Sequence, residues 1–178
     1  MGAIRSESAT SSPRLTIELV PKSSWYDNVR SQVDKKTWDI LRRYQYQLAN
    51  HRCQICTESG LDQGFKHAVE CHEIWEYDDK NFKQTLTGLI ALCPLCHKVK
   101  HAGRVAATGT AQDMLDILTR LHQINDMDHA EAYRYVFNAF RQWSWRSRHK
   151  WTVDVSILNQ LIENSKSIYA TITMRKKR

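Results

Sequence analysis

The sequence predicts an α+β protein in which a small zinc-containing core is flanked by helices. Two Cys-x-x-Cys pairs indicate the zinc, apolar and polar residues alternate between the pairs as in strands, and apolar residues recur every three or four positions on both sides as in helices. The length of 178 residues allows one core with appended elements and leaves no room for a second catalytic domain.

The N-terminal region divides into a tail and a strand–helix unit. Residues 1–13 are rich in serine and have few large apolar side chains, which predicts a disordered tail. Residues 14–50 are expected to pack on the core. Within them residues 15–20 alternate like a half-buried strand, and Asp34 can cap a helix over residues 35–50.

Four cysteines are predicted to form a structural zinc site. Cys53 and Cys56 make one pair, and Cys93 and Cys96 make the other. Each pair can offer two thiolates to one tetrahedral ion, so the two pairs complete a four-cysteine site. A chain without an export signal favours metal ligation over disulfides. The alternative is that the four are free cysteines.

The segment between the cysteine pairs, and the residues just after it, predict a hairpin followed by a helix. Residues 68–75 and 86–92 have the composition of strands, and residues 77–81 form a polar loop between them. From residue 94 to residue 101 the pattern is helical, and Gly103 is placed to end that helix.

Residues 105–163 predict a helical extension. Apolar stripes at 114–121 and at 132–143 indicate two amphipathic helices that face the core, and residues 151–155 alternate like a short strand. Residues 164–178 are expected to be a basic C-terminal strand or tail.

The charge balance favours a polyanionic partner. Lys and Arg total 26 against 19 Asp and Glu, which gives a net charge of +7 and a pI near 9.2. Nucleic acid is the commonest such partner, although many proteins are mildly basic without binding one. No apolar run is long enough for a membrane span and no signal peptide is visible. A soluble, cytoplasmic protein with no membrane partner is therefore expected.

A second metal site is predicted beside the four-cysteine site. His97 and His101 are four residues apart, so both imidazoles project from one face of a helix. The strand at Cys71 and His72 can supply a further ligand.

This order of parts resembles the HNH endonucleases, whose ββα-metal core is a hairpin followed by a helix, here in the treble-clef version braced by zinc. The resemblance covers residues 51–104. It implies that Cys71 is the first metal ligand, His72 the general base, and His97 and His101 the helical ligands. It also implies a metal-dependent endonuclease that hydrolyses phosphodiester bonds in DNA.

Two residues depart from the family pattern. Gly88 stands where the family has asparagine, and Cys71 where it has aspartate or histidine. A thiolate with two imidazoles selects Zn²⁺ or a similar transition metal over Mg²⁺ as the second divalent metal. If His72 is instead a fourth ligand, the site is closed, and the chain is a catalytically silent module that binds nucleic acid or a protein. A purely structural zinc adaptor is a third possibility.

Basic side chains near the predicted site and in the last third are expected to contact phosphates of nucleic acid, with double-stranded DNA as the expected partner. For Lys98, Lys100 and Arg104, which flank the predicted site, the alternative is a solvated helix face with no role in binding. The candidates are Lys98, Lys100, Arg104, Arg146, Arg148, Lys150, Arg175, Lys176, Lys177 and Arg178.

Overall fold

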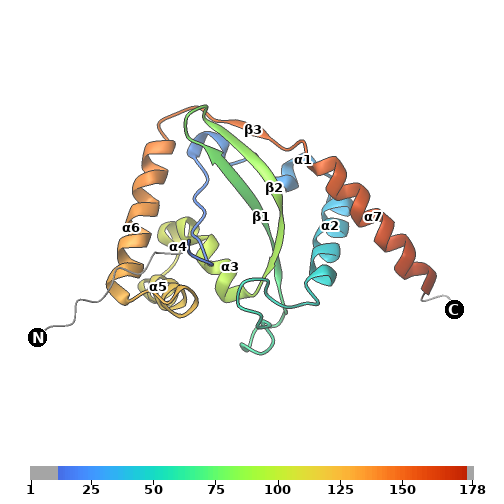
Figure 1. The fold of residues 1–178 in the computed structure, drawn as a ribbon, viewed down its shortest axis with the longest axis horizontal. Coiled ribbons are helices and arrows are strands. Elements are labelled where there is room, and N and C mark those ends of the chain that lie inside the picture. Colours follow the sequence, from blue (N-terminus) through green and yellow to red (C-terminus); the bar gives the residue numbers. More distant parts are fainter. Residues whose placement is uncertain (1–11, 176–178) are drawn as a thin grey trace, which may run out of the picture.

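A computed structural model describes residues 12–175, with side chains for residues 12–167. These residues form a three-stranded sheet with helices on both sides (Figure 1), which confirms the predicted α+β class. Of the predicted tail, residues 1–11 lie outside the described part. The elements are η1 Lys22–Ser24, α1 Val29–Gln32, α2 Lys35–Leu48, β1 Glu70–Asp78, β2 Lys83–Leu92, α3 Pro94–Lys100, α4 Ala102–Thr108, α5 Ala111–Asn125, α6 His129–Arg146, β3 Thr152–Asp154 and α7 Leu158–Arg175.

The predicted hairpin is the centre of the sheet. Strands β1 and β2 pair antiparallel from Glu70 opposite Leu92 to Asp78 opposite Lys83, so both strands reach further toward the turn than predicted. Strand β3 adds to β2 in parallel, which leaves β1 as an edge strand. The free edge of β1 is therefore open to contacts with other parts of the chain.

Two apolar cores lie on either side of the hairpin. Leu92, Val99 and Leu121 belong to the core beneath α3, α5 and α6, whereas Trp38 and Leu86 belong to the core that α2 and α7 cover (Figure 1). Both cores use the hairpin as a wall, so side chains on its two faces enter different environments.

Local signals predict the long helices well. Asp34 caps α2 through a hydrogen bond from the Thr37 amide of 2.6 Å. Ile117 on α5 is fully buried.

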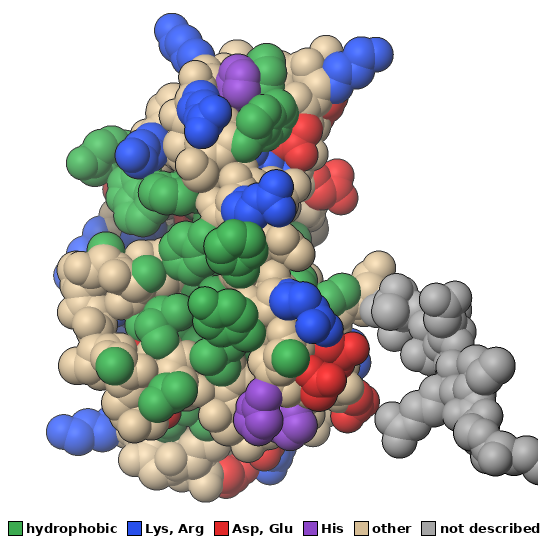
Figure 2. Space-filling view, turned by 90° about the vertical axis from the view of Figure 1, so that its left-hand side faces the viewer, with side chains coloured by type: hydrophobic (Ala, Val, Ile, Leu, Met, Phe, Trp, Pro, Cys, Tyr) green, Lys and Arg blue, Asp and Glu red, His purple; other side chains and the backbone are tan. Residues whose placement is uncertain are grey.

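The outer surface of α6 exposes Tyr133 and Phe137, and Figure 2 shows hydrophobic side chains gathered on this side of the molecule. Among the described residues, no helix is long and apolar enough to cross a membrane.

Residues 15–20 do not form the predicted strand. They pair with no strand of the sheet, and side chains bond to part of their backbone. The Asn125 amide group exchanges two hydrogen bonds of 2.8 Å with the Leu15 backbone, and Trp143 Nε1 donates to the Val20 carbonyl at 2.9 Å. The prediction of a strand over residues 15–20 is therefore wrong.

Two further expectations near helix ends are wrong. Gly103 does not end a helix but lies within α4, where an added Cβ would be 2.8 Å from Leu19 Cδ2. The glycine thus lets the N-terminal segment approach closely. Residues 164–175 belong to α7 and not to the expected basic strand or tail, because the preceding turns of this helix pack on α2 through Leu158 and its neighbours. The last three residues lie outside the described part.

Candidate metal centre

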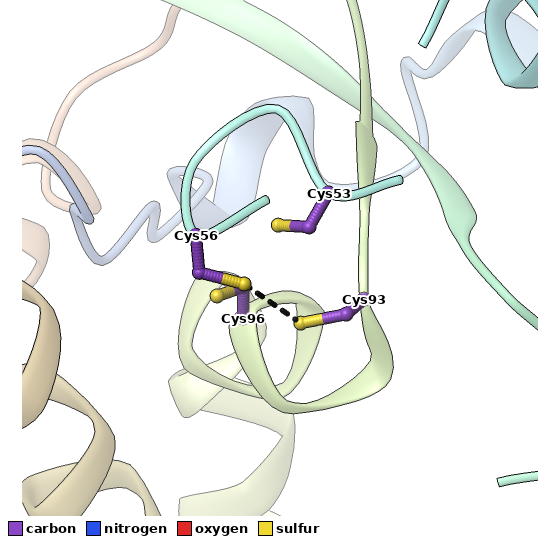
Figure 3. Close-up of side chains that lie close together, drawn as sticks. All are labelled: Cys53, Cys56, Cys93 and Cys96. Atoms are coloured by element: carbon purple, nitrogen blue, oxygen red, sulfur yellow. Dashed lines mark hydrogen bonds between the residues drawn. The ribbon is translucent and has the colours of Figure 1, made fainter. Parts of the chain in front are cut away.

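The four predicted cysteines come together at the end of the hairpin. Cys53 and Cys56 lie on the loop before β1, Cys93 directly follows β2 and Cys96 is in the first turn of α3 (Figure 3). All four sulfur atoms lie within 4.8 Å of one another, and Cys56 Sγ is 3.6 Å from Cys93 Sγ. Zinc–sulfur bonds of about 2.3 Å in a tetrahedron put sulfur atoms about 3.8 Å apart. The cluster can therefore bind a structural metal such as zinc.

Arg120 and the cysteine thiols themselves surround the sulfur atoms with hydrogen-bond donors. Arg120 of α5 donates to Cys96 Sγ at 3.5 Å and to Cys93 Sγ at 3.7 Å, and it pairs with Glu58 at 2.8 Å. Hydrogen bonds from Cys93 and Cys96 hold the pKa of Cys53 far below its usual value. By contrast, burial raises the pKa of Cys56, and the hydrogen bonds of Cys96 with Cys53 and Cys93 raise the pKa of Cys96. The guanidinium offsets part of the negative charge that four thiolates would place on a bound zinc ion.

Three histidines form a second grouping that can hold a metal ion. His72 comes from β1, His97 from α3 and His101 from the residue that ends α3. One ring nitrogen of each lies within 4.8 Å of the others, and Nε2 of His97 is 3.1 Å from Nε2 of His101. The rings meet edge to face, with centroids 4.4 to 5.4 Å apart.

Two of these rings have a carboxylate within hydrogen-bond distance of one ring nitrogen. Glu70 lies 2.8 Å from His97 Nδ1 through Oε2 and 2.9 Å from His67 Nε2 through Oε1, and the His97 hydrogen bond lowers the pKa of Glu70 to about 2. Glu18 Oε2 lies 3.1 Å from His72 Nε2. Because an ionised carboxylate can only accept, the facing ring nitrogens carry the protons and the other nitrogens keep lone pairs.

The electrostatics of the site favour neutral imidazoles at His72 and His101. Burial, together with the charges of His97 and His72, lowers the pKa of His101 to about 3, and burial lowers the pKa of His72. Burial raises the pKa of Glu18, but the hydrogen bond from His72 and the charge of Lys100 outweigh it, so the net shift is downward. Neutral imidazole is the form that ligates metals.

The triad borders a cleft of about 530 Å³. The cleft lies along the edge strand β1 and also contacts α2 and the N-terminal segment. Arg30, Arg104 and Glu73 line it beside the histidines. Burial raises the pKa of Glu73, whose carboxylate accepts from the Val29 amide at 2.8 Å and from Trp75 Nε1 at 3.1 Å.

Cys71 is not part of the triad, so its assignment as first metal ligand is wrong. Its side chain packs in the second core with Trp38 and Trp75, and burial raises the pKa of Cys71 to about 12. Adjacent residues of a strand point to opposite faces, and it is His72 that faces α3. Gly88 pairs with Ile74 away from the triad, and a Cβ there would meet only Ile74 Cδ1, at 3.8 Å.

Half of the candidates for phosphate binding whose side chains are described are engaged by carboxylates. Lys98 binds Asp113 and Asp116, Lys100 is buried against Glu18, and Arg146 binds Asp79 while packing on Tyr77. Each of these three cations has a carboxylate within 3.0 Å, so a phosphate would have to compete with that carboxylate.

The other candidates remain accessible or lie beyond the described side chains. Arg104, Arg148 and Lys150 are exposed, and Arg104 lines the cleft. The structure does not describe the side chain of Arg175 or any part of Lys176, Lys177 and Arg178.

The sequence reasoning missed three residues that support the two groupings. Glu70 carries a signal, because it lies two positions before His72 and so shares its strand face. Glu18 and Arg120 carry none, since they are 54 residues from His72 and 24 residues from Cys96.

Comparisons with protein-family models, curated proteins and solved structures gave no match. The function of the chain must therefore be inferred from the chemistry of its own site.

Proposed function

We propose that the chain is a metal-dependent nuclease of the HNH type that hydrolyses phosphodiester bonds in DNA. The observation that carries the proposal is the triad of His72, His97 and His101 beside a cleft. Three protein ligands leave a coordination position open, as in catalytic zinc sites. The order of hairpin, cysteine pair and helix supports a treble-clef core of the HNH kind.

The triad fits a transition metal better than Mg²⁺. Tetrahedral bonds of about 2.0 to 2.1 Å put two ligand nitrogens about 3.3 Å apart, close to the 3.1 Å between His97 and His101. Three imidazoles suit Zn²⁺ and similar ions, whereas Mg²⁺ prefers oxygen. We therefore propose that the second metal binds to His72, His97 and His101, with His72 as the ligand that was predicted to be Cys71.

Residues that line the cleft can bind the phosphate beside a metal at the triad. A divalent ion at the triad would supply a Lewis acid for the phosphoryl oxygens. Arg104 and Arg30 can bind the phosphate. Glu73 lines the same cleft, but it lies on the strand face of Cys71 and its carboxylate oxygens accept from Val29 and Trp75, so we assign it no role as general base.

A silent binding module is the second candidate. The observation that favours it is the grouping of His72 with His97 and His101, which makes the predicted general base a metal ligand. Such a module would bind through Arg104, Arg148 and Lys150 without cleavage.

Plasmid nicking with Zn²⁺, Co²⁺, Mn²⁺ or Mg²⁺, measured beside the metal content, tests the proposal. Wild type should nick DNA and hold two metals per chain. His72→Ala should lose cleavage and one metal, whereas Arg104→Ala, at the proposed phosphate contact, should weaken cleavage and keep both metals. Glu76→Gln, at an exposed position of the same strand as His72, should behave as wild type. A wild type that binds DNA but nicks it with none of these metals would overturn the nuclease and support the silent module.

A further inference from the structure

Glu18 lies outside the zinc core in sequence, yet its carboxylate reaches the triad. Oε2 is 3.1 Å from His72 Nε2, and Oε1 is 2.5 Å from Lys100 Nζ. The side chains are 14%, 9% and 7% exposed for Glu18, His72 and Lys100. Water therefore has little access to this chain of contacts, and each member has a defined partner.

The segment that carries Glu18 is held in place along its length. Thr16 Oγ1 accepts from Lys100 Nζ at 2.7 Å, and residues two apart in an extended chain point to the same side. Asn125 holds Leu15 through two hydrogen bonds. Lys100 thus holds both Thr16 and Glu18 against α3, one turn from His97.

We propose that Glu18 is a positioning residue for the triad, and that Lys100 in turn positions Glu18. The carboxylate fixes the ring of His72 with its proton on Nε2, so the lone pair lies on Nδ1 and is available to a metal. This inference rests on the proposed metal binding at the triad and adds a residue outside the HNH-like core to that site.

The arrangement of His97 supports the same role. Glu70 lies 2.8 Å from His97 Nδ1, and Glu18 lies 3.1 Å from His72 Nε2, so each of the two rings has a carboxylate on one nitrogen and keeps the other nitrogen for a metal. Partners of this kind fix the tautomer and raise the basicity of a ligand histidine.

Titration with Co²⁺ of full-length protein, with zinc already in the four-cysteine site, tests the proposal. The visible spectrum of Co²⁺ reports ligand geometry, and calorimetry gives its Kd. Glu18→Ala should weaken Co²⁺ binding at the triad about 10- to 100-fold, the usual loss for such a partner. Glu18→Asp, which restores the charge, should recover part of the affinity. Glu76→Ala should bind as wild type.

Retained zinc and a cooperative melting transition would separate positioning from general damage. If Glu18→Ala does not fold, Glu18→Gln, which keeps the size of the side chain, decides in its place. A loss of at least tenfold with a changed cobalt spectrum supports positioning, whereas affinity equal to wild type overturns it. A wild type that binds no more Co²⁺ than His72→Ala would instead overturn the metal binding on which the proposed function depends, and the role of Glu18 with it.

Discussion

Replacing Arg120 should weaken metal binding at the four-cysteine site, although Arg120 lies on α5, outside the hairpin and helix that carry the cysteines. Its guanidinium contacts the sulfur atoms of Cys93 and Cys96, and the residue is only 7% exposed. Arg120→Met keeps much of the apolar stem and removes the charge and the donors. A zinc ion with four thiolates carries two negative charges, so the substitution destabilises the metal-bound state.

The size of the effect follows from the two hydrogen bonds to sulfur. Hydrogen bonds to charged groups contribute about 1.5 to 3 kcal/mol each. The two bonds are 3.5 and 3.7 Å long, so values near the lower end apply. The substitution also removes the cost of burying the charged guanidinium, and this gain offsets part of the loss. A net loss of about 1.4 to 2.8 kcal/mol corresponds to about a 10- to 100-fold rise in the Kd for zinc.

Competition with a chelator of known zinc affinity measures this change. Arg134→Met is the matched control, because Arg134 is exposed on α6. The melting temperature of the zinc-loaded protein should fall in Arg120→Met, since binding to the folded state contributes to its stability. Equal zinc affinity and equal melting temperature in the two variants would refute the reasoning.

Three other predictions follow from the fold. Cys53→Ser or Cys96→Ser should give insoluble or molten protein, because a structural zinc supplies folding free energy; a variant that keeps its zinc and its cooperative melting would contradict this. Deleting residues 175–178 should weaken DNA binding and lower the slope of log K against log salt by about 0.9 for each phosphate that these residues neutralise; an unchanged slope would exclude such a role. Leu121→Ala, at a fully buried position, should reduce the free energy of unfolding by about 2 to 5 kcal/mol in denaturant titrations, and a reduction of less than about 1 kcal/mol would show that the core closes over the gap.

The sequence by itself determined the features that depend on near neighbours. The two cysteine pairs have the spacing that brings two sulfur atoms to one ion, and the structure gathers all four. His97 and His101 share a helix face because they are four residues apart. Asp34 caps α2 because its carboxylate reaches an amide three residues on. Each of these is a local relation that covalent geometry fixes.

Tertiary structure alone decided which residues complete the triad. A strand presents alternate residues to opposite faces, and only the packing of β1 between two cores determines that His72 faces α3 while Cys71 faces Trp38. Lys100 became a buried partner of Glu18 because the N-terminal segment docks on α3. These contacts join residues that lie 54 to 84 positions apart in the sequence. The burial of several elements against one another stabilises them, and no local sequence pattern predicts which elements will pack together.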